Sequence, residues 1–220
     1  MGLLIIRNEM KKNMLGRNHV IASMSLTMAG VVWVNHGGLV DSHVFGSMAL
    51  VTATGVGALA PDLDEENSIA SQKWGSFLSK FFQHRGFMHS LFGWLVWSWI
   101  WLWLFHLAFG MTWRSGPEFF SWMIWFGLTL GYFLHLLEDS FSVAGVRWLN
   151  PLTPYDQWSY EKYHTLLRPV NHWDKDDHGH KIPVRHWWGR GYVVGSDDEK
   201  VITVFCVILA GVALIRAMFF

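Results

Sequence analysis

Three short segments of this chain, each at the edge of a long apolar run, carry aspartate and histidine residues. Carboxylate and imidazole groups are common protein ligands of divalent metals. Ionisable groups are also costly beside the hydrocarbon of a bilayer, so their presence at such edges indicates a functional site. We therefore predict a metal site, provided that the three segments meet in space. The residues concerned are Asp62, Asp64, His84, His89, His135 and Asp139.

The spacing within two of these segments allows both members of a pair to face the same point. His135 and Asp139 are four residues apart, so a helix places them on one face. Asp62 and Asp64 flank a single residue directly after Pro61, which predicts an extended or turn segment that directs two carboxylates together.

The middle segment adds a cation to the histidines. His84 and His89 are five residues apart, and Gly86 between them allows a turn. We expect His84 to precede a helix and His89 to begin it. Arg85 has the planar, bidentate geometry that suits a phosphate or a carboxylate, so it could neutralise an anionic substrate group.

The apolar runs that position these segments predict an all-α, polytopic membrane bundle. The chain is 51% hydrophobic and 15% charged, whereas a typical soluble domain is roughly 25% charged. A membrane-spanning helix needs about 20 residues, and five stretches reach or approach that length. They cover residues 18–40, 42–61, 86–113, 119–137 and 201–220. We expect four core transmembrane helices and a fifth, C-terminal one.

Three regions follow from this pattern. Residues 1–155 form a membrane-embedded core, residues 156–200 a cytoplasmic loop-rich segment with one short helix near 157–167, and residues 201–220 a C-terminal transmembrane helix.

The second apolar run carries small residues at four-residue spacing, which predicts close packing against another helix. These small residues are Ala49, Ala53 and Gly57. The single cysteine, Cys206, excludes an intramolecular disulfide.

The alternation of runs and loops assigns a side to each loop. One side receives the N-terminus, residues 62–85 and the long polar segment, and it holds every Lys and Arg except Arg114 and Arg216. The positive-inside rule therefore places this side, with the N-terminus, in the cytoplasm. The first apolar run lacks a small-residue cleavage site, so we expect it to be retained rather than removed as a signal peptide. If the fifth run does not span, only the C-terminus changes side.

The same alternation brings all the candidate ligands to one membrane face. Metal sites in helical bundles are built from inward side chains of facing helices. His19, at the start of the first run, joins the set as a weaker candidate because it is a single residue. Taken singly, the aspartates also fit a surface loop or helix cap, and His135 fits a packing role. Taken together, they favour a metal site. The zero net charge gives no bias toward nucleic acid.

The order of these motifs resembles the YdjM-like family, described as LexA-regulated, inner-membrane, metal-dependent hydrolases. The resemblance covers roughly residues 15–155, and the segment after Pro151 has no match in it. The chain departs from the family at Met88, where Thr is common. A looser likeness to the all-helical zinc phospholipase C and nuclease group suggests phosphoester chemistry. The residues that carry the resemblance are His19, Pro61, Asp62, Asp64, His84, Arg85, Gly86, His89, Ser90, His135, Asp139, Gly145, Val146, Leu149 and Pro151.

These observations favour a divalent-metal hydrolase at the cytoplasmic membrane surface, acting on an amphiphilic substrate such as a phospholipid. Asp64 is either a further ligand, for a second metal, or the general base. Arg85 would neutralise the substrate, and Glu138 is a supporting carboxylate. Zinc fits the histidine content, whereas manganese or iron fits the carboxylates. The expected ligands are Asp62, His84, His89, His135 and Asp139, with His19 and Asp64 as additional candidates.

Three alternative functions are compatible with the same sequence. A metal or proton transporter is expected to place its ligands near the midplane of the membrane, often on broken helices. A haem-binding cytochrome would need facing histidines and gives no role to the aspartates. A structural scaffold would have no site at all.

Overall fold

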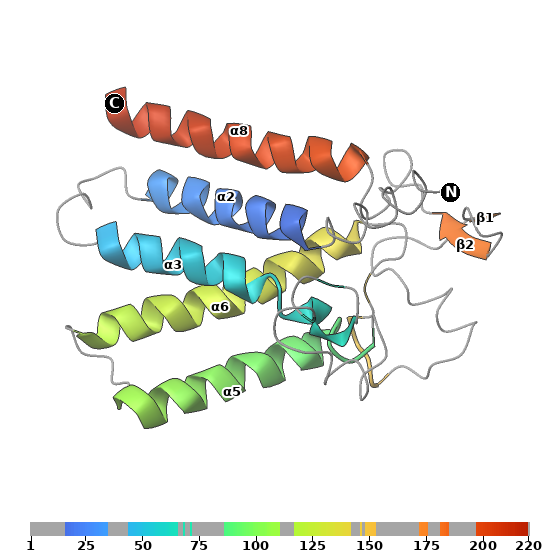
Figure 1. Cartoon of the computed structure of the whole chain (residues 1–220), viewed down its shortest axis with the longest axis horizontal. Helices are drawn as coiled ribbons and strands as arrows, with labels where there is room; N and C mark the ends of the chain where they lie inside the picture. The colour runs from blue at the N-terminus through green and yellow to red at the C-terminus, as the bar shows by residue number, and fades with distance from the viewer. Residues whose placement is uncertain are drawn as a thin grey trace, which may run out of the picture.

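The computed structural model is a helical bundle, shown in Figure 1. It describes residues 16–34, 44–65, 68, 71, 86–110, 117–141, 146, 148–152, 172–175, 181–184 and 197–219. Within these residues the long helices are α2 (Arg17–Val34), α3 (Val44–Gly57), α5 (Leu91–Phe109), α6 (Pro117–Ser140) and α8 (Asp197–Phe219). A short 3-10 helix, η1 (Pro61–Asp64), follows α3.

Successive long helices run in opposite directions, as the alternation of runs and loops predicts. α3 packs between α2 and α6, α5 packs on α6, and α8 lies along α2. The starts of α2, α5 and α8 and the ends of α3 and α6 therefore lie at one end of the bundle (Figure 1). Every segment that carries a candidate ligand among the described residues reaches this end.

Two of the described helical segments, Leu91–Phe109 and Phe120–Ser140, are long and apolar enough to cross a membrane by length and composition. α5 buries only Gly93 and Ser98, and it exposes large apolar side chains such as Trp99. α8 likewise exposes many aliphatic side chains. Apolar outer faces of this kind suit contact with lipid. The number of membrane crossings stays a prediction.

Small residues allow α3 and α6 to approach closely. A Cβ atom on Gly131 would overlap the carbonyl oxygen of Thr54, and one on Gly57 would overlap the carbonyl oxygen of Leu128. Ala53 is buried at the same contact. The close packing predicted for the second apolar run is thus confirmed at Ala53 and Gly57, and it brings the end of α3 against α6.

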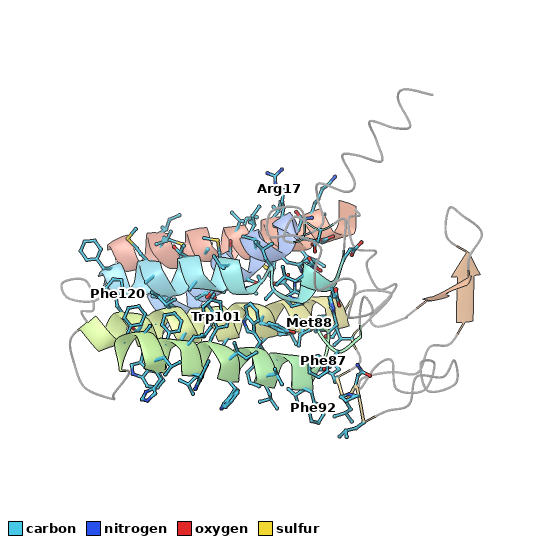
Figure 2. The ribbon with its side chains drawn as sticks, turned by 60° about the horizontal axis from the view of Figure 1, so that its bottom comes forward. Arg17, Phe87, Met88, Phe92, Trp101 and Phe120 are labelled. Atoms are coloured by element: carbon cyan, nitrogen blue, oxygen red, sulfur yellow. The ribbon has the colours of Figure 1, made fainter. Side chains whose placement is uncertain are left out.

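An apolar cluster lies at the end of the bundle where the candidate ligands gather. Its buried members come from four chain segments, so it ties the start of α5 to α6 and to the segments that follow α3 and α6. They are Ala60, Met88, Tyr132, Leu136 and Val146. Figure 2 shows Phe87 and Met88 at the opposite end of the bundle from Phe120. Met88, where the chain departs from the family pattern, packs its side chain into this cluster.

The all-α prediction omitted one element. Strand β1 (His172–Lys175) pairs antiparallel with β2 (Lys181–Val184), with His172 opposite Val184. Strands of four residues contain too few positions for an alternating pattern to stand out, which is why the sequence predicts only a loop-rich segment here. The short helix predicted near residues 157–167 lies outside the described residues. α8 begins at Asp197, four residues before the predicted start at 201.

Candidate metal centre

Two aspartates and two histidines form a closed group, here called the primary cluster (Asp62, His89, His135 and Asp139). Asp62 Oδ1 lies 3.8 Å from His89 Nε2 and 3.6 Å from His135 Nε2. Asp139 Oδ2 lies 3.6 Å from His89 Nε2 and 3.9 Å from His135 Nε2. All four residues are buried. Carboxylate oxygens and imidazole nitrogens therefore alternate around one enclosed position.

The separations within the primary cluster fit metal ligands better than hydrogen-bond partners. An N–H···O hydrogen bond has an N···O distance of up to about 3.2 Å. Two ligands that each lie about 2.1 Å from a tetrahedral zinc ion are about 3.4 Å apart. The observed separations, from 3.6 to 3.9 Å, are close to the second value.

The other nitrogen of each histidine is held by an acceptor of the protein. Asp64 Oδ2 lies 3.2 Å from His89 Nδ1, and the carbonyl oxygen of Ala58 lies 2.7 Å from His135 Nδ1. Each acceptor favours a proton on Nδ1, which directs the lone pair of Nε2 toward the cluster.

The Nε2 atom of His135 provides a test of whether a metal fits. Within the part of the chain that the structure describes, this atom has no hydrogen-bond partner, and the side chain is fully buried. A buried polar atom without a partner is costly. A divalent cation among the four ligands would satisfy this nitrogen and offset the two carboxylates, so the primary cluster fits a metal ion.

The short helix η1 sets the different directions of the two aspartates. Pro61 occupies its first turn, and Ser68 Oγ donates to the carbonyl oxygen of Asp62 at 2.6 Å. The segment is thus a 3-10 turn, one of the two conformations that the sequence left open. In this turn Asp62 faces Nε2 of His89, whereas Asp64 faces Nδ1 of the same imidazole.

His89 is anchored by the residues on either side of it. The hydroxyl group of Tyr132 donates to the carbonyl oxygen of Met88. Ser90 caps the first turn of α5, because its Oγ accepts from the backbone N–H of Gly93 at 3.1 Å. These two contacts fix the backbone at residue 89 and therefore the direction of its imidazole.

A further group of polar side chains adjoins the primary cluster. His19 Nδ1 lies 2.7 Å from Glu138 Oε2, and Ser23 Oγ donates to Glu138 Oε1 at 2.9 Å. His19 Nε2 lies 3.6 Å from Asp139 Oδ1 and 4.0 Å from Glu199 Oε1. The helices α2, α6 and α8 thus each supply at least one member of this group.

The structure brings most of the predicted site residues together at one end of the bundle. These are His19, Asp62, Asp64, His89, His135, Glu138 and Asp139. His84 and Arg85 lie outside the described residues, so their roles stay predictions, as do the catalytic roles of Asp64 and Glu138.

Sequence reasoning missed Glu199 and Ser23. Glu199 precedes the fifth apolar run by two residues, on the side already assigned to the ligands, so extending that run by one turn would have found it. Ser23 lies four residues after His19 on the same helical face, which is the only signal it carries.

Comparison with known proteins supports the resemblance seen in the motifs. The family model described as YdjM inner membrane protein matches residues 14–219, which is nearly the whole chain. The match therefore includes the segment after Pro151, which the motif resemblance did not cover. Neither the curated proteins nor the solved structures gave a match. The chain thus belongs to the YdjM inner membrane protein family.

Proposed function

We propose that this protein is a metal-dependent hydrolase with its active site at the cytoplasmic face of the bacterial inner membrane. The observation that carries the proposal is the primary cluster, above all the buried Nε2 of His135 that faces its two carboxylates. Asp62, His89 and His135 would hold the metal, and Asp139, which lies beside both imidazoles, would complete the ligand set. When bound, a divalent ion there would supply Lewis acidity and activate a water molecule for attack.

The surrounding residues have supporting parts in this proposal. Asp64 and the carbonyl oxygen of Ala58 hold the two imidazoles so that both Nε2 atoms are directed inward. Glu138 is the best candidate to accept a proton from the attacking water. Its side chain is 15% exposed, whereas that of Asp64 is fully enclosed. Proton acceptance requires such access to water.

The position of the site suggests an amphiphilic substrate. The candidate ligands lie where the exposed apolar helices α5 and α8 begin. If these helices contact lipid, the head group of a phospholipid would lie at the depth of the site. Arg85 would neutralise the phosphate of such a substrate. The Lys/Arg bias of the sequence supports a cytoplasmic N-terminus and a multi-pass arrangement.

The metal is proposed to be zinc, because two nitrogen and two oxygen donors suit its tetrahedral preference. Manganese and iron are the alternatives that a carboxylate-rich site also accepts. Elemental analysis of the purified protein would identify the metal.

The experiment combines metal analysis with a substrate panel. The detergent-purified protein is measured by mass spectrometry for bound metal, beside Asp62→Asn, His135→Ala and His106→Ala. The first two should lose metal. His106→Ala is the matched control, because His106 lies exposed near the far end of α5. Hydrolysis of phosphoester and ester substrates should be abolished by a chelator and restored by added metal.

Two results would refute the proposal. Absence of stoichiometric metal in the wild type, even after reconstitution, would remove its basis. Bound metal without turnover of any substrate would instead favour a metal-binding or transport protein.

A further inference from the structure

We infer that this protein binds a second metal ion between His19, Asp139 and Glu199, so that the C-terminal helix α8 supplies a metal ligand. These three residues are called the second cluster. The inference rests on the proposed metal function of the primary cluster and extends it to two ions that share Asp139.

The two distances measured from His19 are short enough for one ion to contact its imidazole together with either carboxylate. Two ligands that each lie about 2.1 Å from an ion can be at most about 4.2 Å apart. His19 Nε2 lies 3.6 Å from Asp139 Oδ1 and 4.0 Å from Glu199 Oε1. Both separations lie within this limit, and both are too long for a hydrogen bond.

Asp139 directs one carboxylate oxygen to each cluster. Its Oδ2 faces His89 and His135, whereas its Oδ1 faces His19. A carboxylate with this orientation can bridge two ions, which lie about 3.5–4 Å apart in two-metal hydrolytic sites. The imidazoles of His19 and His135 have centroids 4.3 Å apart, so the two clusters adjoin.

The orientation of His19 repeats the arrangement of the primary-cluster histidines. Its Nδ1 is held by Glu138, which Ser23 also contacts. This contact favours a proton on Nδ1 and directs the lone pair of Nε2 toward Asp139 and Glu199. A histidine that served only to pair with Glu138 would not need its other nitrogen to face two more carboxylates.

Charge supports two ions rather than one. Asp62, Asp64, Glu138, Asp139 and Glu199 lie around the three imidazoles. Two divalent ions would offset more of the negative charge of these carboxyl groups than one ion would. Like charges in a buried region repel strongly, so the second ion stabilises this arrangement.

The position of Glu199 on α8 fits a ligand better than a helix-stabilising acid. An acid in the first turn favours a helix without being buried. Glu199 is only 4% exposed, although its neighbour Lys200 is exposed. At the far end of α8, the guanidinium group of Arg216 lies 4.8 Å from the centroid of the Trp33 side chain. α8 is thus held along α2 at both ends.

The test measures metal per chain in the purified, metal-reconstituted protein. The wild type should bind two ions, Glu199→Gln one, and Asp62→Asn one. Lys200→Gln, in the same helical turn, is the matched control and should bind two. Manganese-loaded protein provides a second readout by electron paramagnetic resonance, because a bridged pair gives a coupled spectrum. Glu199→Gln should give the six-line spectrum of an isolated ion.

Three results distinguish this inference from the proposed function. One ion in both the wild type and Glu199→Gln would overturn the second site and leave the primary site intact. Two ions in Glu199→Gln would overturn the ligand role of Glu199. No ion in the wild type would overturn both proposals. His19→Asn provides an independent variant if Glu199→Gln does not fold, and it should also bind one ion.

Discussion

Replacing Asp64 by asparagine tests whether this aspartate supports a ligand or is itself one. Asp64 Oδ2 lies 3.2 Å from Nδ1 of His89, and both side chains are fully enclosed. Asparagine can still present an oxygen to Nδ1, so the orientation of the imidazole is kept while the negative charge is lost. The carboxylate behind a metal-bound histidine raises the basicity of its other nitrogen.

We expect Asp64→Asn to bind metal more weakly than the wild type but to bind the same number of ions per chain. Loss of such a supporting carboxylate typically lowers metal affinity about 10- to 100-fold, which corresponds to roughly 1.4–2.7 kcal/mol. The enclosed position of Asp64 excludes screening by water, so we expect the upper half of this range. Asp62→Asn removes a proposed ligand and should lower the stoichiometry itself.

The assay is a competitive titration of the detergent-purified protein against a chromophoric zinc chelator. Glu65→Gln, one residue along the chain, is the matched control for loss of a carboxylate and should keep the wild-type affinity. If Asp64→Asn loses one ion as completely as Asp62→Asn, Asp64 is a ligand and the reasoning from Nδ1 is wrong. If its affinity equals that of the wild type, the contact with His89 has no role in metal binding.

Three further changes test the packing and the metal linkage. Gly131→Ala should destabilise the protein by about 1–3 kcal/mol, because the added methyl group overlaps the carbonyl oxygen of Thr54. Gly30→Ala is the control and should leave the stability unchanged, because a Cβ atom there meets no atom within 4 Å. Thermal unfolding in detergent measures both, and equal midpoints would refute the close approach of α3 and α6. Tyr132→Phe leaves the buried carbonyl oxygen of Met88 without its donor and should cost about 1–3 kcal/mol; an unchanged midpoint would contradict this. Metal at a concentration of 100 times its Kd should raise the free energy of unfolding of the wild type by about 2.7 kcal/mol, and a chelator should remove this stabilisation. An equal stabilisation of Asp62→Asn would argue against metal binding at the primary cluster.

The convergence of the ligands could be predicted because it depends only on the order of apolar runs. Antiparallel neighbours return the chain to the same end of the bundle after every second helix, whatever the details of packing. This was enough to bring His19, His89 and His135 together. It would hold even if the number of membrane crossings differed from the prediction, because the helices pack in the same order.

The different roles suggested for Asp62 and Asp64 could not be predicted, because they depend on a local conformation. In an extended segment both side chains, two residues apart, would point to the same side. In the 3-10 turn they diverge, so that Asp62 faces Nε2 and Asp64 faces Nδ1 of His89. The turn is held by the hydroxyl groups of Ser68 and Ser71, six and eight residues beyond their acceptors, and no recognisable sequence pattern indicates these contacts.

The inward position of Glu199 could not be predicted, because a sequence pattern at the start of a helix does not indicate how the helix is rotated against its neighbour. Three acids, Asp197, Asp198 and Glu199, precede the last apolar run, and a helix directs each about 100° from the next. Which of them faces inward is set by how α8 rotates against α2. The contact of Arg216 with Trp33 at the far end and the buried Glu199 at the near end fix that rotation together. If Glu199 binds metal, the ion also fastens α8 to the bundle, so metal removal should expose the α2–α8 interface to hydrogen exchange before any other helix pair. Uniform exchange across the bundle after metal removal would show that α8 is held by its apolar contacts alone.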